Sequence, residues 1–375
     1  MGKLVFVWDN FGPLHADRCD AVAKMFEGRR EVVGLEIASR SKVYEWAPES
    51  GTRFKKVTLV TGRSMDEIPF HERFSGLLRA CLSAGRHAQF FMCHYNDSAV
   101  FAVSSILKLL GRRVYTLGCS KFDDYERNVR RELFKGILYF PYSGGIASGK
   151  RSRDYMRFIG LPASRVKSPY NAVSLDRIRK LSGAPPAPDG MPFRDRHFTV
   201  VARLVPKKNL SMVLKAMAIY ANQVNNPRAL HIFGTGPLEA ELREQARADE
   251  IAEIVHFRGF LQTAEISKAY GQSLTLLLPS IEEQFGNVVP EAMGMGLPVI
   301  LSDNCGARDL LVRSGVNGFV IEPDNPTGMA FFMRLLSEDE NLWRRMCTAA
   351  QQFAEHADDQ RFAEAVEALV SESGS

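Results

Sequence analysis

The sequence predicts an α/β protein with two doubly wound domains, each built on a parallel β-sheet. Short apolar runs alternate with amphipathic helical segments along the whole chain, which is the pattern of βαβ units. The runs are continuously apolar, as in strands that are buried on both faces. A chain of 375 residues also has the length of two or three domains.

The first half of the chain contains six apolar runs that we expect to be strands. They span residues 4–8, 31–37, 56–60, 88–93, 113–117 and 137–143. Apolar residues at helical spacing predict a helix between two of these runs, at 98–111. This alternation of strands and helices predicts βαβ units, in which the strands lie parallel and the crossover connections are right-handed.

The second half repeats the scheme more regularly. The expected strands span 197–203, 229–234, 254–259, 274–280, 298–303 and 318–323. The expected helices between them span 209–223, 237–250, 263–271, 287–295 and 326–338. Two further helical patterns, 340–357 and 359–372, have no strand after them, so the last helix is free to pack on the first domain.

One segment, SGAPPAPDGMP (182–192), interrupts this rhythm. We expect it to join the domains, because Pro and Gly with little apolar content are typical of linkers. The predicted divisions are an N-terminal domain at 1–180, a linker at 181–195, a C-terminal domain at 196–357 and a terminal helix at 358–375. Ligands of open α/β sheets bind beyond the carboxyl ends of the strands, so two such domains facing each other would form a ligand cleft.

The two halves of the chain carry opposite charge. Residues 1–175 contain 28 Lys and Arg against 17 Asp and Glu, a net charge of +11, while residues 176–375 contain 20 against 26, a net charge of −6. The basic half suits a phosphate-rich partner such as an anionic membrane or a lipid pyrophosphate, or it is a solvated surface. A nucleic-acid partner is not expected, because no aromatic motif is interleaved with the basic residues.

Composition excludes several classes of protein. Hydrophobic residues make up 45% and charged residues 24% of the chain, which excludes a disordered or collagen-like chain. No apolar run approaches the roughly 18–20 residues that span a bilayer, and the start of the sequence lacks the pattern of a signal peptide. The six cysteines lie far apart without a CxxC pair, which predicts reduced thiols and a cytoplasmic protein.

The densest motif is PSIEEQFGNVVPEAMGMGLPV (279–299). It predicts a strand, a loop, Gly286 and a helix, a geometry that presents backbone N–H groups to a phosphate. Glu283 in the loop and Glu291 in the helix can point into one pocket, where their carboxylates would accept hydrogen bonds from hydroxyls. A ligand that is both phosphorylated and polyhydroxylated, such as a nucleotide sugar, fits both features. The alternative is that the two acids only balance the helix dipole.

Two further motifs support an anion site. In ARLVPKKNL (202–210), Arg203 ends a strand and Lys208 opens the next helix, so the two cations could clamp a diphosphate. The alternative is a solvated basic turn. FGTGPLEAEL (233–242) is a glycine-containing turn between strand and helix, which alone is weak evidence.

Together these motifs resemble the donor-binding domain of glycosyltransferase family 4, the retaining GT-B enzymes also called glycosyl transferases group 1. The matching segments are ARLVPKKN, FGTGP, HFRGF, PSIEEQFGNVVPEAMGMGLPVI and SGVNGFVIEP, in order over residues 196–335. The glutamate pair with seven residues between is the family signature. The resemblance implies two Rossmann-like domains that face a cleft, with a C-terminal helix that can cross back to the first domain.

The resemblance also implies roles for residues of the second half. Arg203 and Lys208 would neutralise the donor diphosphate, and Glu283 would contact the transferred sugar near the reacting carbon. Glu291 would hold the ribose hydroxyls. The other residues implied in donor binding are Gly286 and Asn287 at the phosphates, Phe260 and Leu261 at the base, and Gly234 and Gly236 of the FGTGP motif.

The first half resembles the family less. The loop DNFGPLHADR (9–18) has only Gly12 where many members have two glycines, and Gly118 stands where many have a histidine. The pattern S-K-x-D-D-x-x-R at 120–127 is similar to a small branch of the family. The acceptor-side candidates are Gly12, His15, Arg18, His94, Ser120, Lys121, Asp123, Asp124 and Arg127. Their alternative roles are structural: a helix cap with charge pairing, and structural or exposed histidines.

The expected function is that of a retaining glycosyltransferase which moves a sugar from a UDP- or GDP-sugar to a glycan or lipid-linked acceptor, in polysaccharide, lipopolysaccharide or glycolipid synthesis. Front-side substitution is favoured, and no D-x-D pattern requires a metal or other cofactor. The basic half is expected to bind the inner membrane face peripherally. Alternatives are a nucleotide-sugar epimerase of the same fold and a silent GT-B scaffold, whereas a dinucleotide oxidoreductase lacks its G-x-G-x-x-G.

Overall fold

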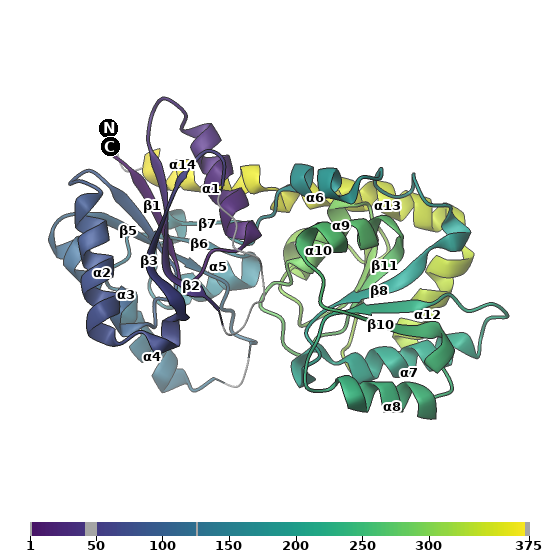
Figure 1. Ribbon diagram of the computed structural model, residues 1–375. Coiled ribbons are helices and arrows are strands. Elements are labelled where there is room, and N and C mark those ends of the chain that lie inside the picture. Colours follow the sequence, from purple (N-terminus) through teal and green to yellow (C-terminus); the bar gives the residue numbers. More distant parts are fainter. Residues whose placement is uncertain (1, 42–50, 125–126, 372–375) are drawn as a thin grey trace. The chain divides into compact units, whose positions relative to one another are not determined.

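The computed structural model describes residues 2–41, 51–124 and 127–371, and the chain divides into two compact units (Figure 1). Unit 1 comprises Met1–Ser174 and Asp359–Ser375, and unit 2 comprises Leu175–Asp358. Each unit has its own parallel sheet with helices on both faces. This confirms the predicted fold class of two doubly wound α/β domains.

Within its described residues, unit 1 has a seven-stranded parallel sheet in the order β3-β2-β1-β4-β5-β6-β7. The strands are β1 (Leu4–Trp8), β2 (Val32–Arg40), β3 (Lys55–Ser64), β4 (Gln89–Met92), β5 (Arg113–Gly118), β6 (Gly145–Ala147) and β7 (Val166–Lys167). The chain runs from β1 outward to β3 and then returns to the other side of β1. This reversal makes a topological switch point between β1 and β4, where the loops that follow the two strands diverge.

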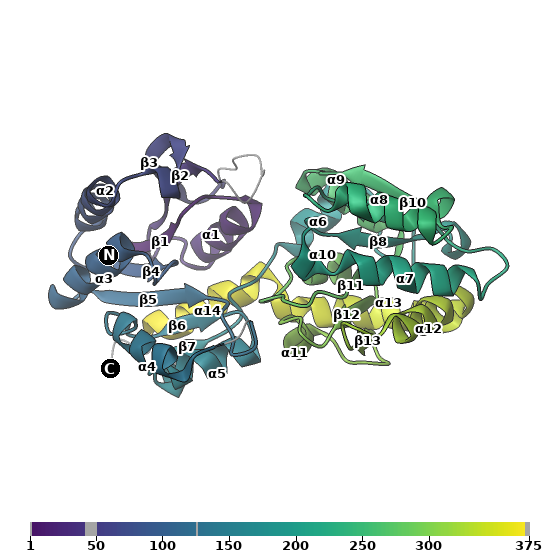
Figure 2. The ribbon, with the colours of Figure 1, turned by 90° about the horizontal axis from the view of Figure 1, so that it is seen from below.

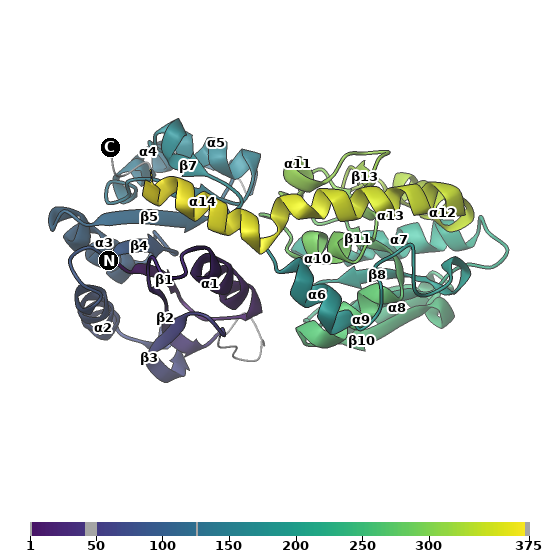
Figure 3. The same ribbon diagram turned by 90° about the horizontal axis from the view of Figure 1, so that it is seen from above.

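Both faces of this sheet are covered by helices. Alternate residues of β1 point to opposite faces, so Val5 and Val7 belong to one buried cluster and Phe6 to another. The first cluster includes side chains from α2 (Phe70–Ser83), α3 (Ser98–Leu109) and α5 (Lys150–Phe158). The second includes side chains from α1 (Pro13–Met25) and α14 (Asp359–Ser371), which lie side by side in Figure 3.

Unit 2 has a six-stranded parallel sheet in the order β10-β9-β8-β11-β12-β13. The strands are β8 (His197–Val201), β9 (Leu230–Phe233), β10 (Val255–Gly259), β11 (Ser273–Leu278), β12 (Val299–Ser302) and β13 (Gly318–Ile321). Here the switch point lies between β8 and β11, because the chain runs outward from β8 to β10 and then returns to β11.

The helices of unit 2 form two layers, one on each side of the sheet (Figures 1 and 2). One layer holds α7 (Leu210–Ala221), α8 (Glu239–Ala248) and α12 (Pro326–Glu338). The other holds α6 (Leu175–Ser182), α9 (Thr263–Gly271), α10 (Val288–Gly294) and α13 (Glu340–Ala354). A short helix, α11 (Arg308–Leu311), follows β12. In the core, Trp343 of α13 donates its indole N–H to the Leu274 carbonyl at 2.8 Å, which fixes α13 to β11.

One predicted strand is wrong. Residues 137–143 continue the end of α4 (Val129–Leu138) into a turn, and the strand that follows is the three-residue β6. The apolar run predicted a strand incorrectly because only some of its residues are buried. Tyr139 and Tyr142 are buried, whereas Ile137 and Phe140 are each 61% exposed. A strand buried on both faces requires every residue of the run to be inside.

The two units divide between Ser174 and Leu175, before the Pro-rich segment at 182–192. That segment is packed within unit 2, where the Ala187 N–H donates to the Met295 carbonyl at 2.9 Å. Gln351 donates in turn to the Ala187 carbonyl at 2.7 Å. Its backbone is therefore held by α10 and α13, which explains how a sequence with linker composition lies in a folded unit. The last helix, α14, belongs to unit 1. No helix among the described residues is both long and apolar enough to cross a membrane.

The packing of α14 gives a first prediction. Phe362 is fully buried, with its ring centre 5.8 Å from that of Phe6. Because the substitution Phe362→Ala would leave a cavity, it should lower the free energy of unfolding of unit 1 by about 3–5 kcal/mol, measured by urea denaturation. Phe331→Ala, at a half-exposed phenylalanine of α12, should change stability by about 0.5 kcal/mol or less. Equal effects of the two substitutions would contradict the packing of α14.

Histidines on neighbouring strands give a second prediction. The rings of His197 on β8 and His231 on β9 stack at 3.8 Å, and burial lowers the pKa of His197 to about 3 and that of His231 to about 4. The unfolded chain therefore binds more protons below pH 6.5, so stability should fall as the pH drops from about 6.5 toward 3, by about 1.4 kcal/mol per pH unit for His197 alone. Urea denaturation of His197→Gln should show a shallower pH dependence than that of the unmodified chain; an unchanged dependence would contradict the assignment.

Candidate functional site

The loops that follow β8 and β11 are bound to each other at the switch point of unit 2. Asn209 adopts a left-handed backbone conformation, with φ of 58°, and ends the short 3₁₀ turn Pro206–Lys208. Its side-chain amide donates to the carbonyls of Pro279 at 3.1 Å and Pro323 at 2.7 Å. The Ile281 N–H donates to the Lys207 carbonyl at 2.9 Å. These bonds fix the basic turn against the loop that carries Glu283.

Lys208 and Glu283 form an ion pair across the switch point. Their side chains are 15% and 14% exposed, so water screens the pair only in part. The loop that carries Glu283 is also bound to the loop after β12, because the Gly306 N–H donates to the Glu283 carbonyl at 3.1 Å. The structure thus brings together two of the three residues predicted to be catalytic, and it places them at the carboxyl ends of adjacent strands.

Gly286 shapes the end of this loop. Its φ of 94° lies in the region that favours glycine, and an added Cβ would lie 3.2–3.3 Å from the side chains of Leu278, Cys305 and Glu283. Asn287 follows, and α10 begins at Val288, one residue later than predicted. The glycine therefore permits the turn that joins the Glu283 loop to Asn287 and α10.

Glu291 lies on α10 and accepts a hydrogen bond from the Tyr270 hydroxyl of α9 at 3.3 Å. Burial and the neighbouring Glu291 carboxylate raise the pKa of Tyr270, which keeps the phenol protonated as a donor. Tyr270 was not predicted from the sequence, because an aromatic residue on the buried side of a helix is indistinguishable from an ordinary core residue. The available signal was its hydroxyl, because a buried tyrosine usually has a hydrogen-bond partner.

Arg203 follows β8 and is exposed. Among the described residues its side chain has no hydrogen-bond or salt-bridge partner, so it is available to an anionic ligand. The loop that carries it runs against the loop after β9: a Cβ on Gly234 would lie 2.0 Å from the Ala202 carbonyl oxygen, and one on Gly236 would lie 2.4 Å from that of Leu204. These glycines permit the close approach of two backbones, a packing role beside the predicted donor contact.

Phe260 and Leu261 follow β10 at the same edge of the sheet and are partly exposed. The Gly234 N–H donates to the carbonyl of the preceding Gly259 at 2.7 Å, which ties the loops after β9 and β10 together. All predicted donor-side residues therefore lie in loops or a helix that follow β8, β9, β10 or β11. Their ligand contacts remain a prediction.

A second pair spans the switch point of unit 1. His94 follows β4 with φ of 58°, and its Nε2 lies 3.0 Å from Oδ1 of Asp9, which follows β1. The neighbouring Cys93 sulfur and the bond to Asp9 raise the pKa of His94. Burial opposes ionisation of Asp9, but the bond and charge of His94 lower its pKa. Asp9 was missed in the sequence, where the signal was a carboxylate directly after the first strand.

The other candidates near β1 have partners inside the unit. The Gly12 N–H donates to Nδ1 of His15 at 3.1 Å, and burial lowers the pKa of His15 to about 3, so this ring is neutral. Arg18 is 2% exposed and donates to the Ala172 carbonyl at 3.1 Å. These contacts show that the three residues help to hold α1 in place.

The S-K-x-D-D-x-x-R segment forms a charge network after β5; its residues 125–126 lie outside the described part of the chain. Nζ of the buried Lys121 lies 3.6 Å from Oδ1 of Asp124. Arg127 contacts Asp124 at 3.3 Å, Glu132 at 3.1 Å and the Tyr155 hydroxyl at 2.9 Å. The network is therefore internal.

The two remaining candidates lie at the surface of this segment. Asp123 is exposed and forms ion pairs with Lys121 at 3.2 Å and with Arg151. Ser120 is partly exposed. Acceptor contacts of either residue remain a prediction.

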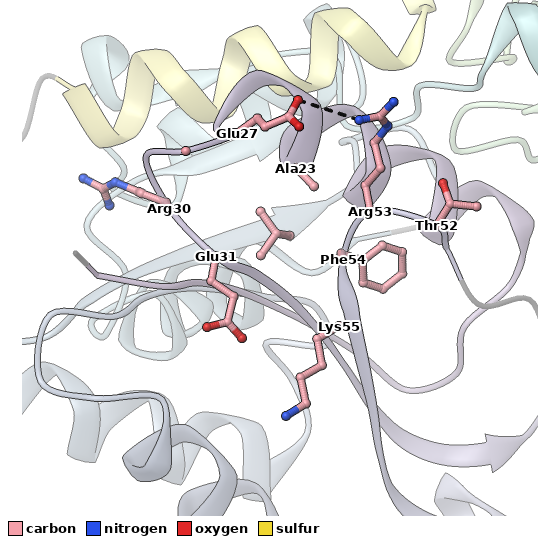
Figure 4. Close-up of a pocket in the computed structure, with 10 residues that line it drawn as sticks. Ala23, Glu27, Arg30, Glu31, Thr52, Arg53, Phe54 and Lys55 are labelled. Atoms are coloured by element: carbon pink, nitrogen blue, oxygen red, sulfur yellow. Dashed lines mark ion pairs between the residues drawn. The ribbon is translucent and has the colours of Figure 1, made fainter.

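Figure 4 shows a cavity of about 620 Å³ in unit 1 that is separate from these sites. Its lining includes an ion pair between Glu27 and Arg53 at 3.7 Å. It also includes Val32 and Lys55, which begin β2 and β3, so the cavity lies at the amino ends of the strands. None of the predicted site residues lines it.

The pair in unit 1 gives a third prediction. Replacing Asp9 by Asn removes the anionic partner of His94, so the pKa of His94 should fall; the titration of its ring protons by NMR measures this. Cys93→Ser, made in parallel, separates the contribution of the sulfur. A pKa of His94 that stays the same in Asp9→Asn would contradict the pair.

The chain is similar to known glycosyltransferases. Residues 190–353 match the model of the family described as "Glycosyl transferases group 1". A D-inositol 3-phosphate glycosyltransferase of Streptomyces avermitilis is 27% identical over 218 residues, 56% of this chain and 47% of that protein. The amylovoran biosynthesis glycosyltransferase AmsK of Erwinia amylovora is 29% identical over 181 residues, 45% of this chain and 44% of that protein. The matched segment thus spans about half the length of these curated relatives.

Solved structures extend the similarity of fold to both units. Anabaena HepE, in a crystal structure with UDP and glucose, is 18% identical with a TM-score of 0.72, and the match covers 99% of this chain and 100% of that chain. At this identity the likeness establishes the fold. The segment 190–353 therefore matches a glycosyl transferases group 1 domain, and the chain has the GT-B fold, as the resemblance implied.

Proposed function

We propose that this protein transfers a sugar, with retention of configuration, from a nucleoside-diphosphate sugar to a hydroxyl of a glycan or lipid-linked acceptor. The observation that carries the proposal is the Lys208–Glu283 pair at the switch point of unit 2, with the exposed Arg203 in the loop that follows the same strand as Lys208. The group 1 domain and the UDP complex of HepE support the donor class, with UDP as the first nucleotide to test.

The donor would lie across the loops that follow β8 and β11. Arg203 and Lys208 supply two positive charges, which suits a diphosphate that becomes the leaving group. Glu291, oriented by Tyr270, would accept hydrogen bonds from the ribose hydroxyls. Since the two cations supply the neutralising charge, we propose that the transfer needs no divalent metal and no other cofactor.

The chemical step follows from these charges. The bond between the anomeric carbon and the diphosphate oxygen breaks, while Arg203 and Lys208 stabilise the negative charge that develops on the diphosphate. The acceptor oxygen attacks from the same face, and its proton passes to the departing phosphate oxygen. Glu283 is held by Lys208 and would stabilise positive charge at the reacting carbon and orient the sugar hydroxyls.

On the acceptor side, we propose His94 and Asp9 as the residues that contact the acceptor. His94 is partly exposed and its raised pKa keeps it protonated, so it suits an acceptor that carries an anionic group near its hydroxyl. The basic character of residues 1–175 suits lipid-linked acceptors at the anionic inner face of the membrane, where the protein would bind peripherally. We therefore propose that the reaction belongs to the synthesis of a surface polysaccharide, lipopolysaccharide or glycolipid.

Donor binding gives a fourth prediction. UDP should raise the melting temperature of the full chain, and Lys208→Ala should weaken UDP binding by about tenfold or more in calorimetric titration, because a charge-assisted contact to phosphate is lost. The matched control is Lys207→Ala, since Lys207 lies in the same turn but its side chain is exposed. Parallel scans with GDP, ADP and CMP identify the base. Equal affinities of the two variants, or no stabilisation by any nucleotide, would contradict the donor site.

Assays of the reaction products distinguish sugar transfer from the alternative functions. With the nucleotide identified, Glu283→Gln should retain UDP binding and lose most of the sugar transfer, and NMR of the product should show the anomeric configuration of the donor. Formation of a new nucleotide sugar without acceptor would instead identify an epimerase. Donor binding with neither product under any acceptor tested would favour the scaffold.

A further inference from the structure

The helix α4 of unit 1 presents its apolar side to solvent. Val129, Leu133, Phe134 and Ile137 are between 61% and 71% exposed, and Phe140, just after the helix, is 61% exposed. We call these five residues the apolar face of α4. A surface helix of a globular protein normally buries such a stripe against the core and turns its charges outward. In α4 this arrangement is reversed.

The charge network described above holds α4 in this orientation. Glu132, which faces inward, is 3% exposed and contacts Arg127 at 3.1 Å and Lys135 at 2.8 Å, while the Tyr155 hydroxyl of α5 also donates to it. Removing one partner of a buried charge leaves the other uncompensated, which is strongly unfavourable. Rotating the apolar face inward would break these contacts, so the network favours its exposure.

Close packing reinforces the orientation. A Cβ on Gly136 would lie 3.3 Å from the Ile159 carbonyl oxygen, so the inward side of α4 approaches the backbone at the end of α5 closely. Figure 2 shows α4 at the outer side of unit 1, beside α5. The apolar face is therefore a fixed feature of the folded unit, and large exposed apolar patches of this kind mark interaction sites.

We propose that the apolar face of α4 inserts into the interfacial region of an anionic lipid bilayer. This deepens the membrane part of the proposed function by naming the element that binds lipid. The charges of α4 match this occupant: Arg130 and Arg131 are exposed, and neither side chain has a partner among the described residues. Glu132, the acid of this helix, is buried and neutralised. A helix with apolar side chains flanked by exposed cations is suited to an anionic membrane surface.

The same charges disfavour a second copy of this chain as the occupant. A two-fold dimer through the face would bring the same surface of both copies together. Such an interface would gather the arginines of both helices at one surface, with no carboxylate of α4 left to neutralise them. A bilayer that contains anionic lipid can bind both kinds of side chain on α4, because its headgroups pair with the arginines and its acyl chains accept the apolar side chains.

The test is binding of the full chain to vesicles of phosphatidylcholine, with and without phosphatidylglycerol, in a sedimentation assay. The double variant Phe134→Ser/Ile137→Ser should bind the anionic vesicles at least tenfold more weakly, which corresponds to about 1.4 kcal/mol. The matched control is Leu109→Ser/Leu110→Ser, two exposed leucines at the end of α3 in the same unit, which should bind as the unmodified chain does. Because all four side chains are exposed, both variants should keep the melting temperature and UDP affinity of the unmodified chain.

Two further measurements separate the apolar from the electrostatic contribution. Phe134→Trp should show a blue shift of the added tryptophan emission with anionic vesicles, which reports entry of this side chain into the bilayer. Arg130→Gln/Arg131→Gln should make residual binding less sensitive to salt. Equal binding of the two double-serine variants would overturn the proposal. So would a vesicle-free dimer of the unmodified chain that Phe134→Ser/Ile137→Ser dissociates, because the face would then join two copies.

Discussion

In each unit, the arrangement of the candidate site residues depends on a charge pair placed across the switch point of the sheet. A doubly wound sheet reverses direction once, and there the loops of two adjacent strands diverge and leave room for a ligand. Each unit bridges this point with a cation and a carboxylate from the two flanking loops, Lys208 with Glu283 in unit 2 and His94 with Asp9 in unit 1. The pair holds side chains in place before a ligand arrives, and it offers a ligand both a positive and a negative group. A phosphorylated sugar contains the complements of both.

Such a pair keeps its geometry only if the backbone beneath it is rigid. In unit 2 this rigidity comes from residues that contribute no charge. Asn209 bonds two carbonyls in neighbouring loops, and Gly234 and Gly236 allow loop backbones to approach more closely than any side chain permits. The sequence signature of the proposed donor site thus mixes residues that would touch the ligand with residues that position them. Catalysis by preorganised charge requires both kinds, because the donors must be in place when charge develops.

The sequence predicted best what is local. The strands of unit 2 lie within two residues of their apolar runs at each end, because a strand buried on both faces has a continuous apolar signal. Motif order sufficed to name Glu283, Arg203 and Lys208 as candidates, and their ligand contacts remain a prediction. The contacts that Asp9 and Tyr270 make could not be predicted, because their partners lie 85 and 21 residues away along the chain. The strand predicted at 137–143 was wrong for a related reason: local hydrophobicity does not reveal which way a side chain faces when a buried glutamate decides the orientation of the helix.

The direction in which side chains face also decides the role of the segment S-K-x-D-D-x-x-R (120–127). Its charged residues suggested contacts with an acceptor, yet Lys121, Asp124 and Arg127 are directed inward, to one another and to Glu132. Buried charges add little net stability when they replace apolar packing, but in this unit the network favours one orientation of α4 over another. Here the specified orientation is one that the hydrophobic effect alone would reject, with the apolar side chains of α4 in water. A charge network that keeps the apolar face of α4 exposed in the free protein is understandable if that face is covered when the protein acts. The exposed arginines on the same helix favour an anionic bilayer as the proposed partner.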